Sequence, residues 1–169
     1  MNSGLLSTIA RLGGVGGLRI LDGGNRFNAY TVARAASGRQ DILNRITVSR
    51  AFTCYQVLSL LESTPATPSP FVVLDLLNTF YDESVQAGER IRLLRACIAH
   101  LERLVAPAEF HSSGMLRNNT EVAGGLVSVH PPSVPSQTAI ELLELLQASA
   151  ADTFVVQAAP LAPEPMRLF

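Results

Sequence analysis

The sequence contains no lysine, because all 13 of its basic residues are arginines. A Schiff-base lysine, a general-base lysine and a phosphate-loop lysine are therefore excluded. Charged residues make up only 16% of the chain and the net charge is −1, whereas about a quarter of an average protein is charged. This low charge argues against a strongly electrostatic nucleic-acid or membrane binder. It also indicates that some apolar surface is covered by a partner or by a second copy.

Cysteine and histidine are scarce, with two and three residues in 169. Cys54 and Cys97 have no partner at metal-ligand or redox-motif spacing, and each falls on an expected helix face as a small buried hydrophobe. The histidines at His100, His111 and His130 are scattered, so a metal site has little support. The N-terminus lacks a signal-peptide pattern, and no apolar run approaches the roughly 20 residues of a membrane span. We therefore expect a soluble, cytoplasmic protein with no metal and no cofactor.

The stretch Pro70–Tyr81 organises the rest of the chain. Its apolar run from Phe71 to Leu74 predicts a strand buried on both faces. This strand delivers Asp75 to its carboxyl end, where ligands bind in open α/β sheets. Asp75 is therefore the first candidate for chemistry. In the alternative interpretation it only caps the turn or helix that follows.

Expected strands and helices alternate along the chain. Further strands are expected at Leu18–Asp22, Ile46–Arg50, Leu126–His130 and Asp152–Gln157. Helices are expected at Ser3–Leu12, Phe27–Ala36, Phe52–Glu62, Gly88–Val105 and Thr138–Ala150, with a helical turn at Asp41–Asn44. This alternation predicts a three-layer α/β/α fold with a mainly parallel sheet. We expect one domain over residues 1–157 and a proline-rich C-terminal tail over residues 158–169.

Two local patterns carry further expectations. Glycine fills four of the five positions from 13 to 17. A phosphate loop follows a strand and opens a helix, whereas this run precedes a strand and has no lysine, so it is interpreted as a turn that ends the first helix. In the helix expected at Phe52–Glu62, the pattern predicts that Phe52, Tyr55, Leu58 and the pair Leu60 and Leu61 are buried.

From Leu18 to about Leu104 the chain resembles the core of RecA-like strand-exchange recombinases, especially the archaeal and eukaryotic branch. Residues 21–27 (Leu-Asp-Gly-Gly-Asn-Arg-Phe) are similar to the strand of that family that ends in Asp-Thr-Glu-Gly-Thr-Phe. Residues 46–56 (Ile-Thr-Val-Ser-Arg-Ala-Phe-Thr-Cys-Tyr-Gln) are similar to its Ala-Arg-Ala-Phe/Tyr-Asn…His-Gln strand and helix. The segment Phe71–Asp75 lies where the family has its Walker B strand. The resemblance implies a RecA-like P-loop NTPase core without the P-loop strand.

The same resemblance implies that ATPase activity is lost. The chain starts in what would be the helix after the phosphate loop, so the loop and its strand have no counterpart. The water-activating glutamate of the family falls at Gly24, which has no side chain. Asp75 and Asp22 would then be vestigial, with no nucleotide phosphate or magnesium ion to act on. The expectation is a protein that is not an enzyme.

Two loops that bind DNA in that family have poorly matching counterparts in this chain. Residues 78–89 contain three acidic residues and no basic residue, and residues 131–137 also contain no basic residue. Neutralising DNA phosphates requires basic residues. Arginines of the helix expected at Gly88–Val105 could instead contact nucleic acid or a protein partner, although a merely solvated helix face is the other interpretation. These arginines are Arg90, Arg92, Arg95 and Arg103.

Three functions follow as hypotheses. The first is a catalytically inactive RecA-like paralogue that acts as a protein-interaction or assembly component in DNA recombination or repair. The alternative is a nucleic-acid-binding accessory protein that uses the arginine face. The third is an enzyme with unrelated chemistry around Asp75 and Asp22, for which the sequence shows no nucleophile–base pair and no metal cluster.

Two structural expectations complete the analysis. Asp22 and Asp75 should emerge side by side at the carboxyl edge of the sheet, because their strands are neighbours in the recombinase fold. The P-loop strand of that fold lies inside the sheet, so its loss leaves its neighbours paired with each other or leaves an open edge. We therefore expect a homodimer or a complex with a related partner, the segment Pro160–Phe169 reaching across, and no membrane association.

Overall fold

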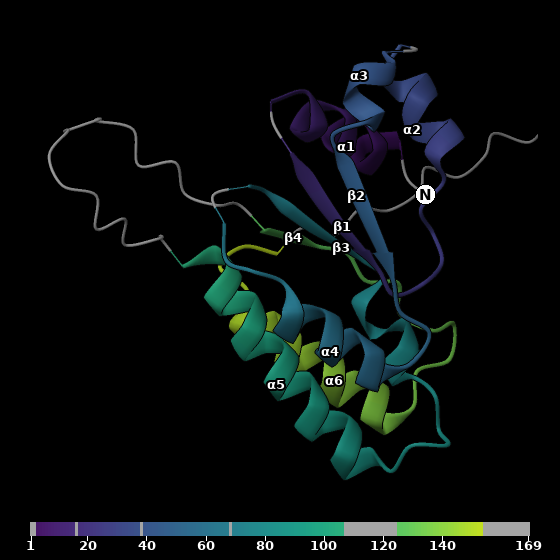
Figure 1. Cartoon of the computed structure of the whole chain (residues 1–169). Helices are drawn as coiled ribbons and strands as arrows, with labels where there is room; N and C mark the ends of the chain where they lie inside the picture. The colour runs from purple at the N-terminus through teal and green to yellow at the C-terminus, as the bar shows by residue number, and fades with distance from the viewer. Residues whose placement is uncertain (1–2, 16, 38, 68, 107–124, 154–169) are drawn as a thin grey trace, which may run out of the picture.

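A parallel four-stranded sheet with the order β2-β1-β3-β4 forms the centre of the protein (Figure 1). The structure is a computed structural model that describes residues 3–15, 17–37, 39–67, 69–106 and 125–153. The strands are β1 (Leu18–Asp22), β2 (Ile46–Arg50), β3 (Phe71–Leu74) and β4 (Gly125–Val127). In the register of the sheet, Asp22 lies opposite Arg50 on one side and Leu74 on the other.

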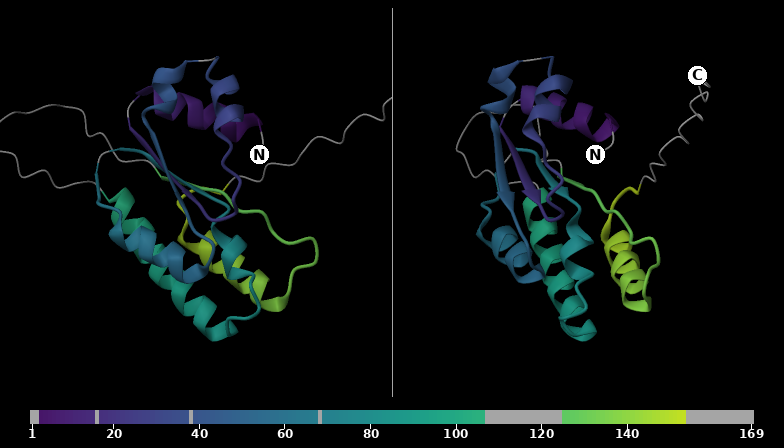
Figure 2. Two further views of the ribbon diagram at one scale, coloured as in Figure 1. Left: turned by 45° about the vertical axis from the view of Figure 1, so that its right-hand side comes forward. Right: turned by 90° about the vertical axis from the view of Figure 1, so that its right-hand side faces the viewer.

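Helices cover both faces of the sheet (Figure 2). On one face lie α1 (Ser3–Val15), α2 (Ala29–Ala35) and α3 (Gln40–Leu43). On the other lie α4 (Cys54–Ser63), α5 (Ala87–Val105) and α6 (Gln137–Ser149). A short 3-10 helix, η1 (Leu76–Phe80), follows β3. The result is an α/β fold with an all-parallel sheet, consistent with the expected three-layer arrangement.

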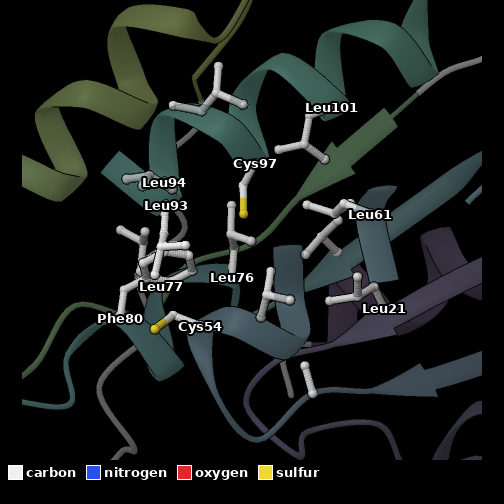
Figure 3. Packing of buried hydrophobic residues seen from close by; sticks show 14 of the residues in the cluster. Leu21, Cys54, Leu61, Leu76, Leu77, Phe80, Leu93, Leu94, Cys97 and Leu101 are labelled. Carbon is white, nitrogen blue, oxygen red and sulfur yellow. The ribbon is translucent and has the colours of Figure 1, made fainter. Parts of the chain in front are cut away.

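Strand β3 is buried along its whole length, as its continuous apolar run predicts. Val73 packs into the cluster under α4, α5 and α6, whereas Val72 packs into the cluster on the α1 side. Cys54 and Cys97 are buried in the first of these clusters, which confirms the interpretation of both as small hydrophobes (Figure 3). Burial raises the pKa of the Cys97 thiol to about 12, so this thiol is protonated at neutral pH.

Helix α1 continues through Gly13 and Gly14 to Val15, so the expectation that these glycines end the helix is wrong. A β-carbon at Gly13 would lie 3.0 Å from Cγ2 of Ile42. The missing side chain therefore lets α1 approach α3 closely. Here tertiary packing outweighs the low helix propensity of glycine, which is worth about 1 kcal/mol per residue.

The prediction that Phe52 and Tyr55 are buried is also wrong, because their exposed fractions are 71% and 50%. Helix α4 begins later than expected, at Cys54, with Thr53 as the N-cap that accepts a 3.2 Å hydrogen bond from the Gln56 backbone. Its buried positions are Cys54, Val57 and Leu61. Phe52 thus precedes the helix, and Tyr55 lies off the stripe that faces the core.

The C-terminal part differs in two ways from the expected strands. The strand expected at Leu126–His130 is paired only over Gly125–Val127, although Ser128 still exchanges backbone hydrogen bonds with Val73 and Leu76 at 2.8 and 3.1 Å. Asp152 and Thr153 are not in a strand, and the rest of Asp152–Gln157 lies outside the described residues, as do the tail and its segment Pro160–Phe169. In the described ranges, no helix combines the length and apolar character needed to cross a membrane.

Candidate functional site

Asp22 and Asp75 lie together at the carboxyl edge of the sheet, as expected. Strands β1 and β3 are parallel neighbours, and Asp22 at the end of β1 lies opposite Leu74, which directly precedes Asp75. Both carboxylates are buried, with exposed fractions of 0% and 1%. A buried carboxylate requires hydrogen-bond or ion-pair partners, so its neighbours determine what it can do.

Both oxygens of Asp22 are held by the turn that follows β1. Oδ1 accepts a 2.8 Å hydrogen bond from the backbone N–H of Arg26, and Oδ2 accepts one of 2.8 Å from that of Phe27. The guanidinium of Arg50, on the neighbouring strand, places Nε 3.5 Å from Oδ2. Asp22 therefore connects the end of β1 to the segment before α2 and to β2.

Asp75 joins three further parts of the chain. Its Oδ2 lies 3.1 Å from Nε of Arg26, and its Oδ1 accepts a 2.9 Å hydrogen bond from the backbone N–H of His130. Its own N–H donates to Oγ of Ser128 at 3.0 Å. Although Asp75 precedes η1, its side chain makes no capping hydrogen bond, so the alternative interpretation as a simple cap does not describe its role.

The backbone of Asp75 is strained. Its φ of 56° and ψ of 50° lie in the left-handed region, which costs a non-glycine residue about 1 kcal/mol or more. Gly24 packs directly against this residue, because a β-carbon at Gly24 would lie 2.5 Å from both Cβ and Oδ2 of Asp75. Position 24 therefore has no room for any side chain while Asp75 keeps its place.

The charge of Asp75 contributes to the raised pKa of Tyr81, which follows η1. Burial, and then the negative charge of Asp75, raise the pKa of its phenol to about 12. Its hydroxyl is buried, and no group in the described ranges forms a hydrogen bond with it. This part of the site therefore favours neutral groups and disfavours a second anion.

We expect this raised pKa to make the protein less stable at alkaline pH. The folded pKa of Tyr81, about 12, exceeds its ordinary value of 10.0, so the stabilising contribution is complete below pH 10.0 and is lost as the pH rises through 12. Tyr81→Phe should lose less unfolding free energy over that range in urea titrations.

Tyr30→Phe is the matched control, because Tyr30 is 70% exposed. Equal pH dependence in wild type and Tyr81→Phe would contradict the prediction. The Cys97 thiol acts in the same direction but is present in all three proteins.

A small open pocket of about 180 Å³ adjoins this edge. The lining residues do not include Asp22 or Asp75, so the two carboxylates do not face it. No group of three or more histidine, cysteine, aspartate or glutamate side chains in the described ranges is placed to hold a metal ion. The pocket is lined by Gly23, Gly24, Asn25, Ala51, Phe52, Asn78, Thr79 and Asp82.

The structure separates the four arginines that were expected to form one contact face. Arg90 is buried, with an exposed fraction of 6%, and donates from Nη1 to the carbonyl of Phe80 at 3.2 Å, so its assignment as a surface contact is wrong. Arg103 donates from Nη2 to the carbonyls of Leu61 and Thr64 at 2.9 and 3.0 Å. It therefore stabilises the C-terminal end of α4, where a positive charge is favourable.

Of these four arginines of α5, Arg92 and Arg95 are exposed. Nη2 of Arg92 lies 2.6 Å from Oε1 of Glu89. This ion pair raises the pKa of Arg92 and lowers that of Glu89. Arg95 has no ion-pair partner within the described ranges. Two arginines, one of them neutralised, give weak support to an electrostatic nucleic-acid interface.

Sequence reasoning missed the groups that hold the two carboxylates. Arg26 and His130 contact Asp75 from 49 and 55 positions away, and no local pattern connects them. Arg50 could have been suggested by its place at the end of the strand beside β1, where it meets Asp22. No protein-family model matches this sequence, and no curated protein matches it significantly.

Proposed function

We propose that this protein is a catalytically inactive relative of RecA-like recombinases that acts as a protein-interaction or assembly component in DNA recombination or repair. The observation that carries the proposal is the contact between Gly24 and Asp75, which leaves no room for a catalytic glutamate. The assignment to recombination or repair rests on the resemblance of the segments around Asp22, Ala51 and Asp75.

The state of the two aspartates supports the inactive part of the proposal. A nucleotide hydrolase of this class needs a carboxylate near Mg²⁺ and a second one that activates water. Asp75 is already paired with Arg26 and with the His130 amide, and Asp22 is held by two backbone amides. Both act as acceptors that join chain segments, which is a structural use of a buried charge.

The surface supports the association part. Phe52, just before α4, and Tyr55, in its first turn, both expose large aromatic side chains, and aromatic residues are enriched at protein interfaces. Strands β2 and β4 are the outer strands of the described sheet, and no further strand in those ranges pairs with them. An open strand edge is a template for another chain.

We expect no binding of ATP, because the chain contains no lysine and Gly24 replaces the glutamate. Calorimetric titration of the full chain with Mg-ATP should show only the heat of dilution. Mg-ATP titrated into buffer alone is the control. A dissociation constant in the micromolar range would contradict the inactive part of the proposal.

The association part is tested by light scattering coupled to size exclusion at micromolar concentration. The full chain should elute with at least twice the mass of one copy. A version that ends at Gln157 tests whether the last residues contribute. A compact monomer in both cases would reject self-association.

A further inference from the structure

The pocket beside Gly24 has the size and chemistry of a site for one long cationic side chain. Its volume of about 180 Å³ is below the range of small-molecule sites, which is about 300–1,000 Å³. The lining includes Asp82, Asn25 and Asn78, whose side chains carry oxygen acceptors, and the exposed aromatic residue Phe52. A guanidinium group combines several donors with a flat face that stacks on aromatic rings.

The ionisable residue in the pocket lining is Asp82. Hydrogen bonds from Ser84, with a smaller contribution from Arg90, hold the pKa of Asp82 below its usual range, so Asp82 is ionised at neutral pH. Burial raises the pKa of the neighbouring Cys54, and the charges of Asp82 and Glu89 raise it further. No arginine or histidine of the described ranges lies within ion-pair distance of Asp82.

Thr79 adds an unsatisfied group to the same lining. It is 7% exposed, and its Oγ1 is buried without a hydrogen-bond partner in the described part of the chain. Buried hydroxyl groups without partners are uncommon in folded proteins, because each costs about 1–3 kcal/mol. Because Oγ1 itself is inaccessible to solvent, a donor that enters the pocket reaches it only after the Thr79 side chain rotates about χ1.

The surface next to the pocket carries exposed arginines. Helices α4 and α5 lie side by side (Figures 1 and 2), and Tyr55, in the first turn of α4, makes a small contribution to the raised pKa of Arg92. Arg95 is one turn further along α5 and is exposed. The pocket lies beside the start of α4, through Phe52, and the unpaired guanidinium lies on the neighbouring helix α5. In a twofold dimer each copy offers the same pocket and the same arginine to the other.

We propose that two copies of this chain associate through this surface, with Arg95 of each copy entering the Phe52–Asp82 pocket of the other. The inference rests on the proposed function as an association component, and it names the partner and the residues that meet. The guanidinium pairs with Asp82 and stacks on Phe52, while Tyr55 becomes covered at the rim. Charge pairs of this kind give an interface its specificity and register.

A charge exchange on the full-length chain tests this arrangement. Asp82→Arg places two arginines opposite each other in the homodimer, and Arg95→Asp places two aspartates opposite each other. Each variant alone should dimerise at least tenfold more weakly than wild type in sedimentation equilibrium, because like charges meet. An equimolar mixture of the two variants should recover dimers, since the mixed dimer contains one native Arg95–Asp82 pair and one reversed pair, both of opposite charge.

Arg45→Asp is the matched control, because it makes the same change at an exposed arginine outside this surface. Asp82→Asn and Arg95→Gln test the same pair with smaller changes. Each should weaken the dimer, and mixing should recover it only in part, because the mixed dimer regains one of the two Arg95–Asp82 pairs. A wild-type dimer that neither charge reversal weakens would overturn the pocket assignment but not association. A wild-type monomer would overturn both, and failure of the mixture to recover dimers would overturn the Asp82–Arg95 pairing.

Discussion

Gly24→Ala should destabilise the protein by about 3 kcal/mol, the upper part of the range for overpacking a well-packed core. The added methyl group would lie 2.5 Å from Cβ and Oδ2 of Asp75. Asp75 cannot easily retreat, because its backbone is in a strained left-handed conformation and its carboxylate is held by Arg26 and His130. The new side chain must therefore break at least one of these contacts.

The measurement is the free energy of unfolding in urea, with circular dichroism as the signal. Gly88→Ala is the control, because no atom lies within 4 Å of the position of its added β-carbon and Gly88 is in the first turn of α5. That change should be neutral or should stabilise by up to about 1 kcal/mol. Equal effects of the two substitutions would show that Gly24 does not pack against Asp75. Gly24→Glu should be at least as destabilising as Gly24→Ala and should not produce ATP hydrolysis.

Asp22→Ala should cost about 4 kcal/mol, because hydrogen bonds to a charged acceptor contribute about 1.5–3 kcal/mol each. The substitution removes the acceptor for the backbone N–H groups of Arg26 and Phe27, both at 2.8 Å, and the partner of Arg50. Asp22→Asn keeps the shape but turns an NH₂ group toward one of the two N–H groups. It should cost less than Asp22→Ala but more than 1 kcal/mol.

Asp152→Ala is the matched control for Asp22, since Asp152 is exposed and lies beyond α6. Its effect should stay within about 0.5 kcal/mol. Urea unfolding of all three variants at pH 7 provides the comparison. A loss below 1 kcal/mol for Asp22→Ala would mean that the turn after β1 holds its conformation without the carboxylate.

The strands could be predicted because their signals are local. The apolar run Phe71–Leu74, followed by Asp75, identifies a strand without knowledge of its neighbours, and both faces are indeed buried. The predicted and observed bounds of β1 and β2 also agree, although β2, an outer strand, has no fully buried residue. The expectation that Asp22 and Asp75 lie on adjacent strands is confirmed by the pairing of β1 with β3.

Side-chain environments were predicted less well, because burial depends on the orientation of an element as well as on its type. Arg90 and Arg92 are two positions apart on α5, yet one is buried against Phe80 and the other is exposed beside Glu89. Successive helix residues are about 100° apart. Helical spacing alone therefore leaves the inward direction undetermined until α4 and α6 are in place.

The sequence by itself determined the alternation of strands and helices and the position of both aspartates at strand ends, since these depend on residues close together in the chain. Only the tertiary structure decided what the aspartates do. The partners Arg26 and His130 reach Asp75 across 49 and 55 positions, and Gly24 matters because Asp75 occupies the space beside it. Such contacts follow from the order and register of the sheet, which bring distant segments to one edge. A buried carboxylate at that edge is then stabilised by the hydrogen-bond donors of those segments.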